Sequence, residues 1–157
     1  MNEEMSFMLR AIQLSKEGME HNHGGPFGAV IVKDGKIIGE GCNRVTSTND
    51  PTAHAEITAI RNACQALNAY DLTGTEIYCS CEPCPMCLAA IYWARISKIY
   101  FANTRKDAAA IGFDDDLIYA EIPKNNNERL VPAFQLLHTE ALQVFEAWKL
   151  KEDKTEY

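Results

Sequence analysis

A histidine, a glutamate and two cysteines have the types and spacing of a catalytic metal site. His54 and Glu56 open the segment "HAEITAIRNAC", and Cys84 and Cys87 stand three residues apart in "CEPCPMC". Residues at i and i+3 share one face of a helix, so both thiolates can bind one ion. Two thiolates and an imidazole suit Zn²⁺, and three protein ligands leave a fourth position for water, as in catalytic zinc sites.

Glu56 is expected to move protons rather than to bind the ion. Residues at i and i+2 point to different sides of a helix, yet in a first turn both His54 and Glu56 can border one pocket. A carboxylate beside a zinc-activated water can take its proton and return it to a leaving group. The alternative is a structural zinc site with Cys79 or Cys81 as fourth ligand, in which Glu56 is only a first-turn acid favoured by the helix dipole.

The segments around these residues are predicted to alternate between helix and strand. Apolar residues at helical spacing predict helices over 3–20 and 53–67. "AVIV" and "KIIGEG" flank Asp34-Gly35, which predicts a β-hairpin. Further along we expect a strand at 76–81, a helix with Pro85 in its first turn and a strand at 98–103. The rest of the chain is predicted to form a short helix breaking into a loop in "DAAAIGFDDDLIY", a short strand in "VPAFQLL" and a closing helix in "TEALQVFEAWKLKE".

This order of elements predicts an α/β protein, a three-layer α/β/α sandwich with a central mixed sheet. Residues that stand where strands end and helices begin gather at one edge of such a sheet. Residues 54–56 begin a helix, and residues 81–87 join a strand to a helix. We therefore expect the two segments to share a site.

Composition limits the class of protein and of ligand. The 157 residues are 46% hydrophobic, which fits one globular domain over 1–157. The net charge is −7, with 15 basic against 22 acidic residues, and binding to nucleic acid needs clustered Lys and Arg. A small neutral or cationic ligand is expected instead, and no nucleic acid.

The N-terminus and the cysteines indicate a cytoplasmic protein. "MNEEMSFMLRAIQLS" lacks the features of a signal peptide, and no apolar run approaches the about 18 residues of a membrane span. Four of the six cysteines lie within residues 79–87, which favours metal or thiol chemistry over disulfides. Cys42 and Cys64 are predicted to be small buried apolar residues, and His21 and His23 to be surface histidines.

Several motifs resemble the cytidine deaminase-like superfamily over nearly the whole chain. These are "TAHAE", "CEPCPMC", "GGPFGAVIV" and "CNRV". The first two contain the H-x-E and P-C-x-x-C patterns, which are the known signature of zinc nucleobase deaminases. "NDPTAHAE", "EPCPMCLAAIYWAR" and "AAAIGFDDDLIY" look more narrowly like bacterial guanine deaminases. The resemblance implies one Zn²⁺ per subunit and hydrolysis of guanine to xanthine and ammonia by a zinc-activated water, with Glu56 as proton shuttle, in purine catabolism.

The resemblance also implies how a purine would be held. Asn43 and the backbone around Ala55 would read the edges of the base, and Phe27 and Trp93 would form walls for its ring. From chemistry alone, Asn43 could equally be a turn residue, Phe27 an ordinary core residue, and Trp93 part of the core packing of its helix.

The acidic run and the C-terminus complete the implied site. Asp115 would hold or relay a proton to the departing amine, with Asp114 as the alternative acid. Family members use the C-terminal tail of a neighbouring subunit as a lid, which would place Tyr157 over the substrate of a homodimer with a swapped C-terminal segment. Without the resemblance, the aspartates would be a solvated loop or a helix cap, and the tail would fray.

Two other functions stay open at this point. A tRNA adenosine deaminase, or a deaminase of another free base, shares the first two motifs. The acidic charge, "GFDDDLIY" and the terminal "EY" favour the guanine enzymes. A structural zinc module without catalysis belongs to a different class, and the position of Glu56 argues against it.

Overall fold

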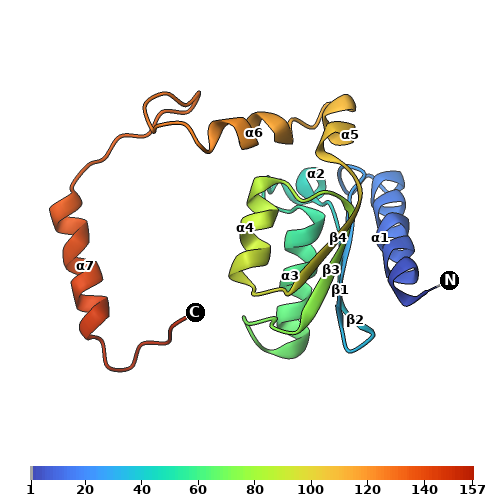
Figure 1. Ribbon diagram of the computed structural model, residues 1–157, viewed down its shortest axis with the longest axis horizontal. Helices are drawn as coiled ribbons and strands as arrows, with labels where there is room; N and C mark the ends of the chain where they lie inside the picture. Colours follow the sequence, from blue (N-terminus) through green and yellow to red (C-terminus); the bar gives the residue numbers. More distant parts are fainter. Residues whose placement is uncertain (1) are drawn as a thin grey trace. The chain divides into compact units, whose positions relative to one another are not determined.

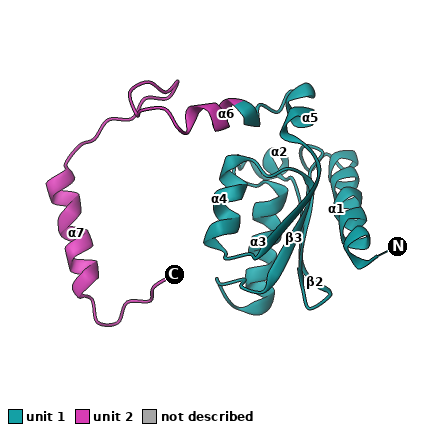
Figure 2. Ribbon diagram, in the orientation of Figure 1, with its two compact units in different colours: residues 1–116 teal, residues 117–157 magenta. Residues whose placement is uncertain are grey.

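The computed structural model describes residues 2–157, which divide into two compact units (Figure 2). The first unit ends at Asp116, and the second runs over Leu117–Tyr157. None of the helices in residues 2–157 has the length and hydropathy of a membrane span.

Four strands form one mixed sheet in the first unit. They are β1 (Gly28–Lys33), β2 (Lys36–Cys42), β3 (Thr75–Cys81) and β4 (Lys98–Asn103). Their order is β2-β1-β3-β4; β1 is antiparallel to β2 and β3, and β3 is parallel to β4. The hairpin between β1 and β2 turns at Asp34 and Gly35, with φ angles of 49° and 71°, as a two-residue turn requires. The predicted hairpin is confirmed.

Helices cover both faces of this sheet (Figure 1). The helices of the first unit are α1 (Glu3–Glu20), α2 (Val45–Thr48), α3 (Ala55–Leu67), α4 (Pro85–Trp93) and α5 (Arg105–Ala110). Figure 1 shows α1 on one face and α3 and α4 on the other. Alternate residues of β1 join different cores: Ala29 and Ile31 pack on the α3 side, and Val30 and Val32 on the α1 side. The predicted three-layer α/β/α sandwich is confirmed.

Helix α3 lies unusually close to the sheet. Its inward residues Ala55, Ala59 and Ala63 are fully buried. A Cβ atom on Gly41 would lie 2.3 Å from the carbonyl oxygen of Ala55, and one on Gly39 would lie 2.5 Å from that of Ala59. Only glycine fits at these two positions of β2, because the obstructing atoms belong to the helix backbone. The close approach fixes the height of α3 above the sheet.

The C-terminal part of the chain is helical with irregular connections. After α5 the chain turns at Gly112, whose φ is 97°, and enters α6 (Asp115–Glu121), which crosses the boundary between the units. The closing helix is confirmed as α7 (His138–Leu150). The predicted strand over 131–137 is wrong, because this segment is irregular and pairs with no strand of the sheet. An apolar run without a partner strand cannot satisfy its backbone hydrogen bonds as a strand.

Candidate active site

Three predicted metal ligands lie together where α3 and α4 begin. The Nδ1 atom of His54 is 3.5 Å from the Sγ atom of Cys84 and 3.5 Å from that of Cys87. The ligand atoms of the three residues all lie within 4.8 Å of one another. Zn–S and Zn–N bonds of about 2.3 and 2.0 Å at a tetrahedral angle separate sulfur from nitrogen by about 3.5 Å, so this arrangement fits one zinc ion.

Helix starts hold these ligands in place. His54 is the N-cap of α3, and Cys84 is the N-cap of α4, where its sulfur accepts a hydrogen bond from the Cys87 backbone N–H at 3.5 Å. Pro85 occupies the first turn of α4. Proline is tolerated there because the N–H group that it lacks would have no acceptor within the helix. Cys79 and Cys81 lie outside the group of ligands found among residues 2–157, so no fourth protein ligand is present there. An open fourth position is the arrangement of a catalytic zinc site.

The two thiols already differ in acidity. Hydrogen bonding with Cys87 is the main cause that lowers the pKa of Cys84 to about 4, and His54 contributes in the same direction. The contact with Cys84, together with burial, raises the pKa of Cys87. The hydrogen bond from His54 to Cys84 raises the pKa of that imidazole. Zinc binds cysteine as the thiolate, so metal binding would release any proton that the two thiols still carry.

Glu56 is buried beside the ligands, in the first turn of α3. Its side chain is 7% exposed, and its Oε2 accepts a hydrogen bond from the Cys87 thiol at 3.4 Å. Burial is the main cause that raises the pKa of this carboxyl. A buried carboxyl beside the metal ligands is placed to accept and return a proton, which suits a proton shuttle.

A cavity of about 270 Å³ opens in front of these residues. It is lined by Gly25, Phe27, Asn43, Val45, Thr46, Pro51, His54, Glu56, Cys81, Glu82, Cys84, Phe113 and Asp115. The volume lies near the lower end of small-molecule pockets, and the lining is largely apolar with a few polar groups. Such a cavity suits a single small, flat, polar-edged molecule.

Two phenylalanines form the aromatic wall of the cavity. The rings of Phe27 and Phe113 meet edge to face, with centroids 4.8 Å apart and an interplanar angle of 89°. A Cβ atom on Gly25 would lie 3.0 Å from the Phe113 ring and 3.1 Å from the Phe27 ring. Phe113 was missing from the sequence prediction; its only signal was its place in an apolar stretch before the acidic run.

The side-chain amide of Asn43 is fixed by the backbone of two loops that border the cavity. The residue is 5% exposed, and its Oδ1 accepts hydrogen bonds from the backbone N–H groups of Gly25 at 3.2 Å and Val45 at 3.1 Å. These bonds use the carbonyl oxygen and leave the NH₂ group to donate. Asn43 is therefore both the clamp of the surrounding loops and a donor suited to a ring nitrogen or carbonyl.

The three consecutive aspartates have different surroundings. Asp115 lines the cavity, and burial is the main cause that raises its pKa. Asp116 lies 3.4 Å from the Nε atom of Arg105 in an ion pair. Asp114 is exposed and does not line the cavity. The structure thus brings Asp115, rather than Asp114, to the site.

Of the other predicted contacts, Ala55 lies at the site, and Trp93 and Tyr157 do not line the cavity. Ala55 is fully buried between His54 and Glu56 at the start of α3, where first-turn N–H groups lack helical partners. Trp93 ends α4, is 68% exposed and does not line the cavity. Tyr157 belongs to the second unit and is 71% exposed.

Comparison with known proteins identifies the family. The model of the cytidine and deoxycytidylate deaminase zinc-binding region matches residues 1–103. The chain belongs to this family. The family model describes a zinc-binding region, and in this chain His54, Cys84 and Cys87 form a group that is compatible with one zinc ion.

The relatives within the family differ in how much of the chain they match. Guanine deaminase of Bacillus subtilis is 56% identical over 157 residues, 100% of both chains. A crystal structure of that protein covers 100% of this chain and 99% of its own, with a TM-score of 0.96. The tRNA-specific adenosine deaminase of Agrobacterium fabrum is 45% identical over 111 residues, 71% of this chain and 72% of its own. A solved structure of guanine deaminase from Nitrosomonas europaea is 33% identical in sequence and has a TM-score of 0.66. The match covers 69% of this chain and 63% of that one.

Proposed function

We propose that this chain is a zinc-dependent guanine deaminase that hydrolyses guanine to xanthine and ammonia. The observation that carries the proposal is the full-length likeness to guanine deaminase of Bacillus subtilis, which continues through residues 117–157. The match to the Agrobacterium tRNA-specific enzyme covers 71% of the chain. The net charge of −7 also disfavours a tRNA substrate.

The cavity supplies what a neutral purine needs. The Phe27–Phe113 pair offers an apolar wall for the ring, and the NH₂ group of Asn43 can donate to an acceptor on its edge. None of the residues that line the cavity is a lysine or arginine, which fits a base without a phosphate group. Together these groups would orient the base with the carbon that bears the amine toward His54 and Glu56.

The chemistry follows from the groups around that carbon. Zinc held by His54, Cys84 and Cys87 supplies the Lewis acidity that lets a water ionise near pH ~7. Glu56 would take one proton from the water that adds its oxygen to this carbon and pass it to ring nitrogen N3, and would then carry the second proton of that water to the amine, which leaves as ammonia as the carbon–nitrogen bond breaks. Asp115, which also lines the cavity, would hold or relay a proton to the departing amine.

The same proposal includes a cytoplasmic homodimer with exchanged C-terminal segments and a single functional domain over 1–157. Helix α7 has no buried residue and exposes Val144, Phe145 and Trp148 at 66%, 74% and 44%. Apolar side chains gathered on one helix mark an interaction surface. In the first unit, α4 exposes Tyr92 and Trp93 at 76% and 68%. A second copy is the proposed partner, with Tyr157 as a lid and Trp93 as a ring wall across the interface.

The substrate assignment is tested with purified zinc-loaded protein. We expect guanine to be consumed and ammonia to be released in equal amounts, followed by the change in ultraviolet absorbance on conversion to xanthine. An adenosine-containing tRNA anticodon arm and free adenine serve as competing substrates. Guanine left unchanged while the anticodon arm is deaminated would assign the chain to the tRNA enzymes, and no deamination of any base would support a non-catalytic zinc module.

A further inference from the structure

One glutamate that lines the cavity has no part in the chemistry described so far. Glu82 follows β3 directly and stands two residues before the metal ligand Cys84. It is partly buried and borders the same cavity as Glu56 and Asp115. Its Oε2 atom accepts a hydrogen bond from the backbone N–H of Arg105 at 3.0 Å. The carboxylate is therefore bonded to a part of the chain 23 residues away.

Three contacts join the end of β3 to the start of α5. The pairing of β3 with β4 reaches Cys81 and Asn103, and the backbone N–H of Glu82 then donates to the Asn103 carbonyl at 2.8 Å. The Cys81 thiol donates to the Thr104 carbonyl, with 3.6 Å between sulfur and oxygen. The side chain of Glu82 adds the bond to Arg105, which is the first residue of α5. The turn before the metal ligands is thus bonded to a helix.

The bond from Arg105 satisfies a donor that the helix itself leaves open. An N–H group at the first position of a helix has no acceptor within the helix. Thr104 and Asp107 form a capping box, in which each side chain accepts from the backbone N–H of the other residue. That box serves the N–H groups of Thr104 and Asp107, and Glu82 serves the N–H of Arg105. Loss of the Glu82 carboxylate would leave this partly buried donor without its acceptor.

Helix α5 connects this bond to the aromatic wall of the cavity. Ala108, in the middle of the helix, is 2% exposed, and its N–H donates to the Thr104 carbonyl at 3.1 Å. The backbone N–H of Phe113 donates to the Ala108 carbonyl at 3.0 Å, so the chain after the helix is bonded back onto it. The ring of Phe113 meets that of Phe27 at the cavity. A shift of α5 at Arg105 would therefore shift the ring of Phe113.

The acid at the cavity depends on the same residue of α5. Asp115 begins α6 two residues after Phe113, and its neighbour Asp116 lies 3.4 Å from the Nε atom of Arg105. Arg105 thus contacts Glu82 through its backbone and Asp116 through its side chain. Residues 113–116 and the turn before the metal ligands meet at this one residue.

We propose that Glu82 is a positioning residue for the reaction, which acts through the N–H of Arg105 and holds Phe113 and Asp115 in place at the cavity. The inference rests on the function proposed above. Glu82 acts here as a hydrogen-bond acceptor, and it contacts none of the reacting atoms in this role. Groups that orient a substrate have to be held closely, since a small misplacement far from the chemistry is costly in rate. An uncharged acceptor of the same length should therefore replace Glu82.

Variants of Glu82 separate the hydrogen bond from the charge. In Glu82→Ala the acceptor is lost, and kcat/KM for guanine should fall roughly tenfold or more. In Glu82→Gln a carbonyl oxygen can accept the same bond, and kcat/KM should stay within about threefold of the wild type. The zinc content should be the same in both variants. A glutamine variant as impaired as the alanine variant would assign the effect to the charge and overturn the proposal, as would normal kcat/KM or loss of zinc in Glu82→Ala.

Glu76→Ala is the matched control. Glu76 stands near the other end of β3, where its carboxylate accepts from the Tyr78 hydroxyl at 3.1 Å and pairs with Lys98 of β4 at 3.1 Å. It is thus a second glutamate of the same segment that bonds to a neighbouring strand, and it does not line the cavity. Its removal should leave kcat/KM for guanine unchanged. A fall equal to that of Glu82→Ala would show a general loss of stability and overturn the proposal.

The donor can be removed without a change at Glu82. Proline lacks the N–H but is favoured at the first position of a helix, and Thr104 before it is already extended, with φ −89° and ψ 164°. Arg105→Pro and Arg105→Ala both lose the side chain, and the proline variant also loses the N–H. We expect kcat/KM to be roughly tenfold lower in the proline variant than in the alanine variant, with no further loss when Glu82→Ala is added. Additive losses, or equal activity of the two variants, would contradict the proposal even if Glu82→Ala failed to fold.

Hydrogen exchange supplies a readout that needs no substrate. In zinc-loaded protein, amides of residues 106–116 should exchange faster in Glu82→Ala and in Arg105→Pro than in the wild type, while Glu82→Gln stays protected. Amides of α3 should exchange alike in all of these proteins. Unchanged exchange over 106–116 in Glu82→Ala would overturn the proposal. A wild-type protein that leaves guanine unchanged would refute the proposed function instead, and the exchange result would still decide whether Glu82 holds this segment.

Discussion

The acidity of the active-site residues depends on which partner each one has. Cys84 accepts hydrogen bonds and has its pKa lowered to about 4, while burial raises the pKa of Glu56 and of Asp115. A lowered pKa suits a metal ligand, and a raised pKa suits an acid that must hold a proton. The surroundings thus shift the thiol and the two carboxyl groups of one site in opposite directions.

Replacing Glu56 with alanine separates catalysis from metal binding. Because Glu56 contacts the ligands without belonging to their group, Glu56→Ala should keep one zinc ion in the catalytic site. Turnover of guanine should fall by at least about 10²–10⁴-fold, the usual contribution of a general acid–base group. Zinc content and steady-state kinetics on the same sample measure both effects. Cys84→Ala is the contrasting variant and should lose the zinc itself; substantial turnover by Glu56→Ala would refute the shuttle.

Gly25 limits the width of the aromatic wall. In Gly25→Ala the new methyl group would lie 3.0 Å from the Phe113 ring and 3.1 Å from the Phe27 ring, so both rings would have to shift. We expect KM for guanine to rise roughly tenfold or more, since small misplacements of a binding group are costly. Kinetics at constant zinc content measure this. A variant with normal zinc content and normal KM would mean that the two rings do not contact the substrate.

At the scale of elements, the first turns of α3 and α4 carry the metal ligands and Glu56, and packing on the sheet positions these two helices. The hairpin, the central strands and the main helices could be predicted, because Asp34-Gly35 and long periodic apolar patterns are local signals. The four-residue helix α2, which ends at Asn49 in the left-handed conformation with φ 51°, gave no such signal. Phe113 reaches the cavity only because of the path of the loop around Gly112, and that path depends on distant packing.

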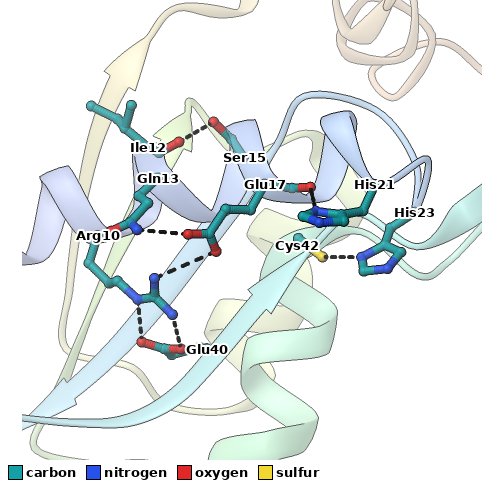
Figure 3. A network of polar contacts seen from close by, with 9 residues as sticks. All are labelled: Arg10, Ile12, Gln13, Ser15, Glu17, His21, His23, Glu40 and Cys42. Atoms are coloured by element: carbon teal, nitrogen blue, oxygen red, sulfur yellow. Dashed lines mark hydrogen bonds and ion pairs between the residues drawn. The ribbon is translucent and has the colours of Figure 1, made fainter.

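An ion pair attaches α1 to the edge strand β2 (Figure 3). Arg10 Nε and a terminal nitrogen of the same side chain each lie 2.8 Å from one carboxylate oxygen of Glu40, a bidentate pair. The hydrogen bond from Arg10 lowers the pKa of Glu40 below its ordinary 4.5. A lowered carboxyl pKa contributes stability above the unfolded value, and this stability is lost as the pH falls through the folded value.

Glu40→Gln should therefore destabilise the protein at neutral pH and not in acid. The pair is partly exposed, so the expected loss in the free energy of unfolding is only about 1 kcal/mol at pH 7. The difference from the wild type should shrink as the pH falls below 4.5. Urea unfolding of both proteins across this range measures it. Lys16→Gln, which alters an exposed pair on the same helix, is the control, and an equal loss at every pH would contradict the account.

At the scale of the whole molecule, the second unit lacks a core of its own. None of the residues of α6 or α7 is buried, and Leu130, Val131 and Phe134 are exposed at 70%, 83% and 78%. An isolated helix of this length is marginal in water. The order of this segment therefore has to come from packing against other surfaces, as the proposed dimer supplies.

Removal of residues 154–157 tests the proposed lid. Without Tyr157 the substrate would be less well enclosed, and guanine turnover should fall roughly tenfold or more, about 1.4 kcal/mol in the barrier. Tyr157→Phe is the conservative variant and should retain most of the activity, because the ring still covers the substrate. Sedimentation should show the same oligomer in all three proteins. An unchanged rate in the truncated protein would return the tail to an exposed end without a function.

The close approach of α3 to β2 limits which positions can be changed when the pocket is redesigned. Gly39 and Gly41 touch the α3 backbone, and α3 carries His54 and Glu56 at its start, so a side chain at either glycine would move two active-site residues at once. Val45 and Thr46 line the cavity and take no part in the contact between the two glycines and α3. A mutant library for other purines should therefore vary 45 and 46 and keep both glycines, which makes substrate range and metal geometry separately adjustable.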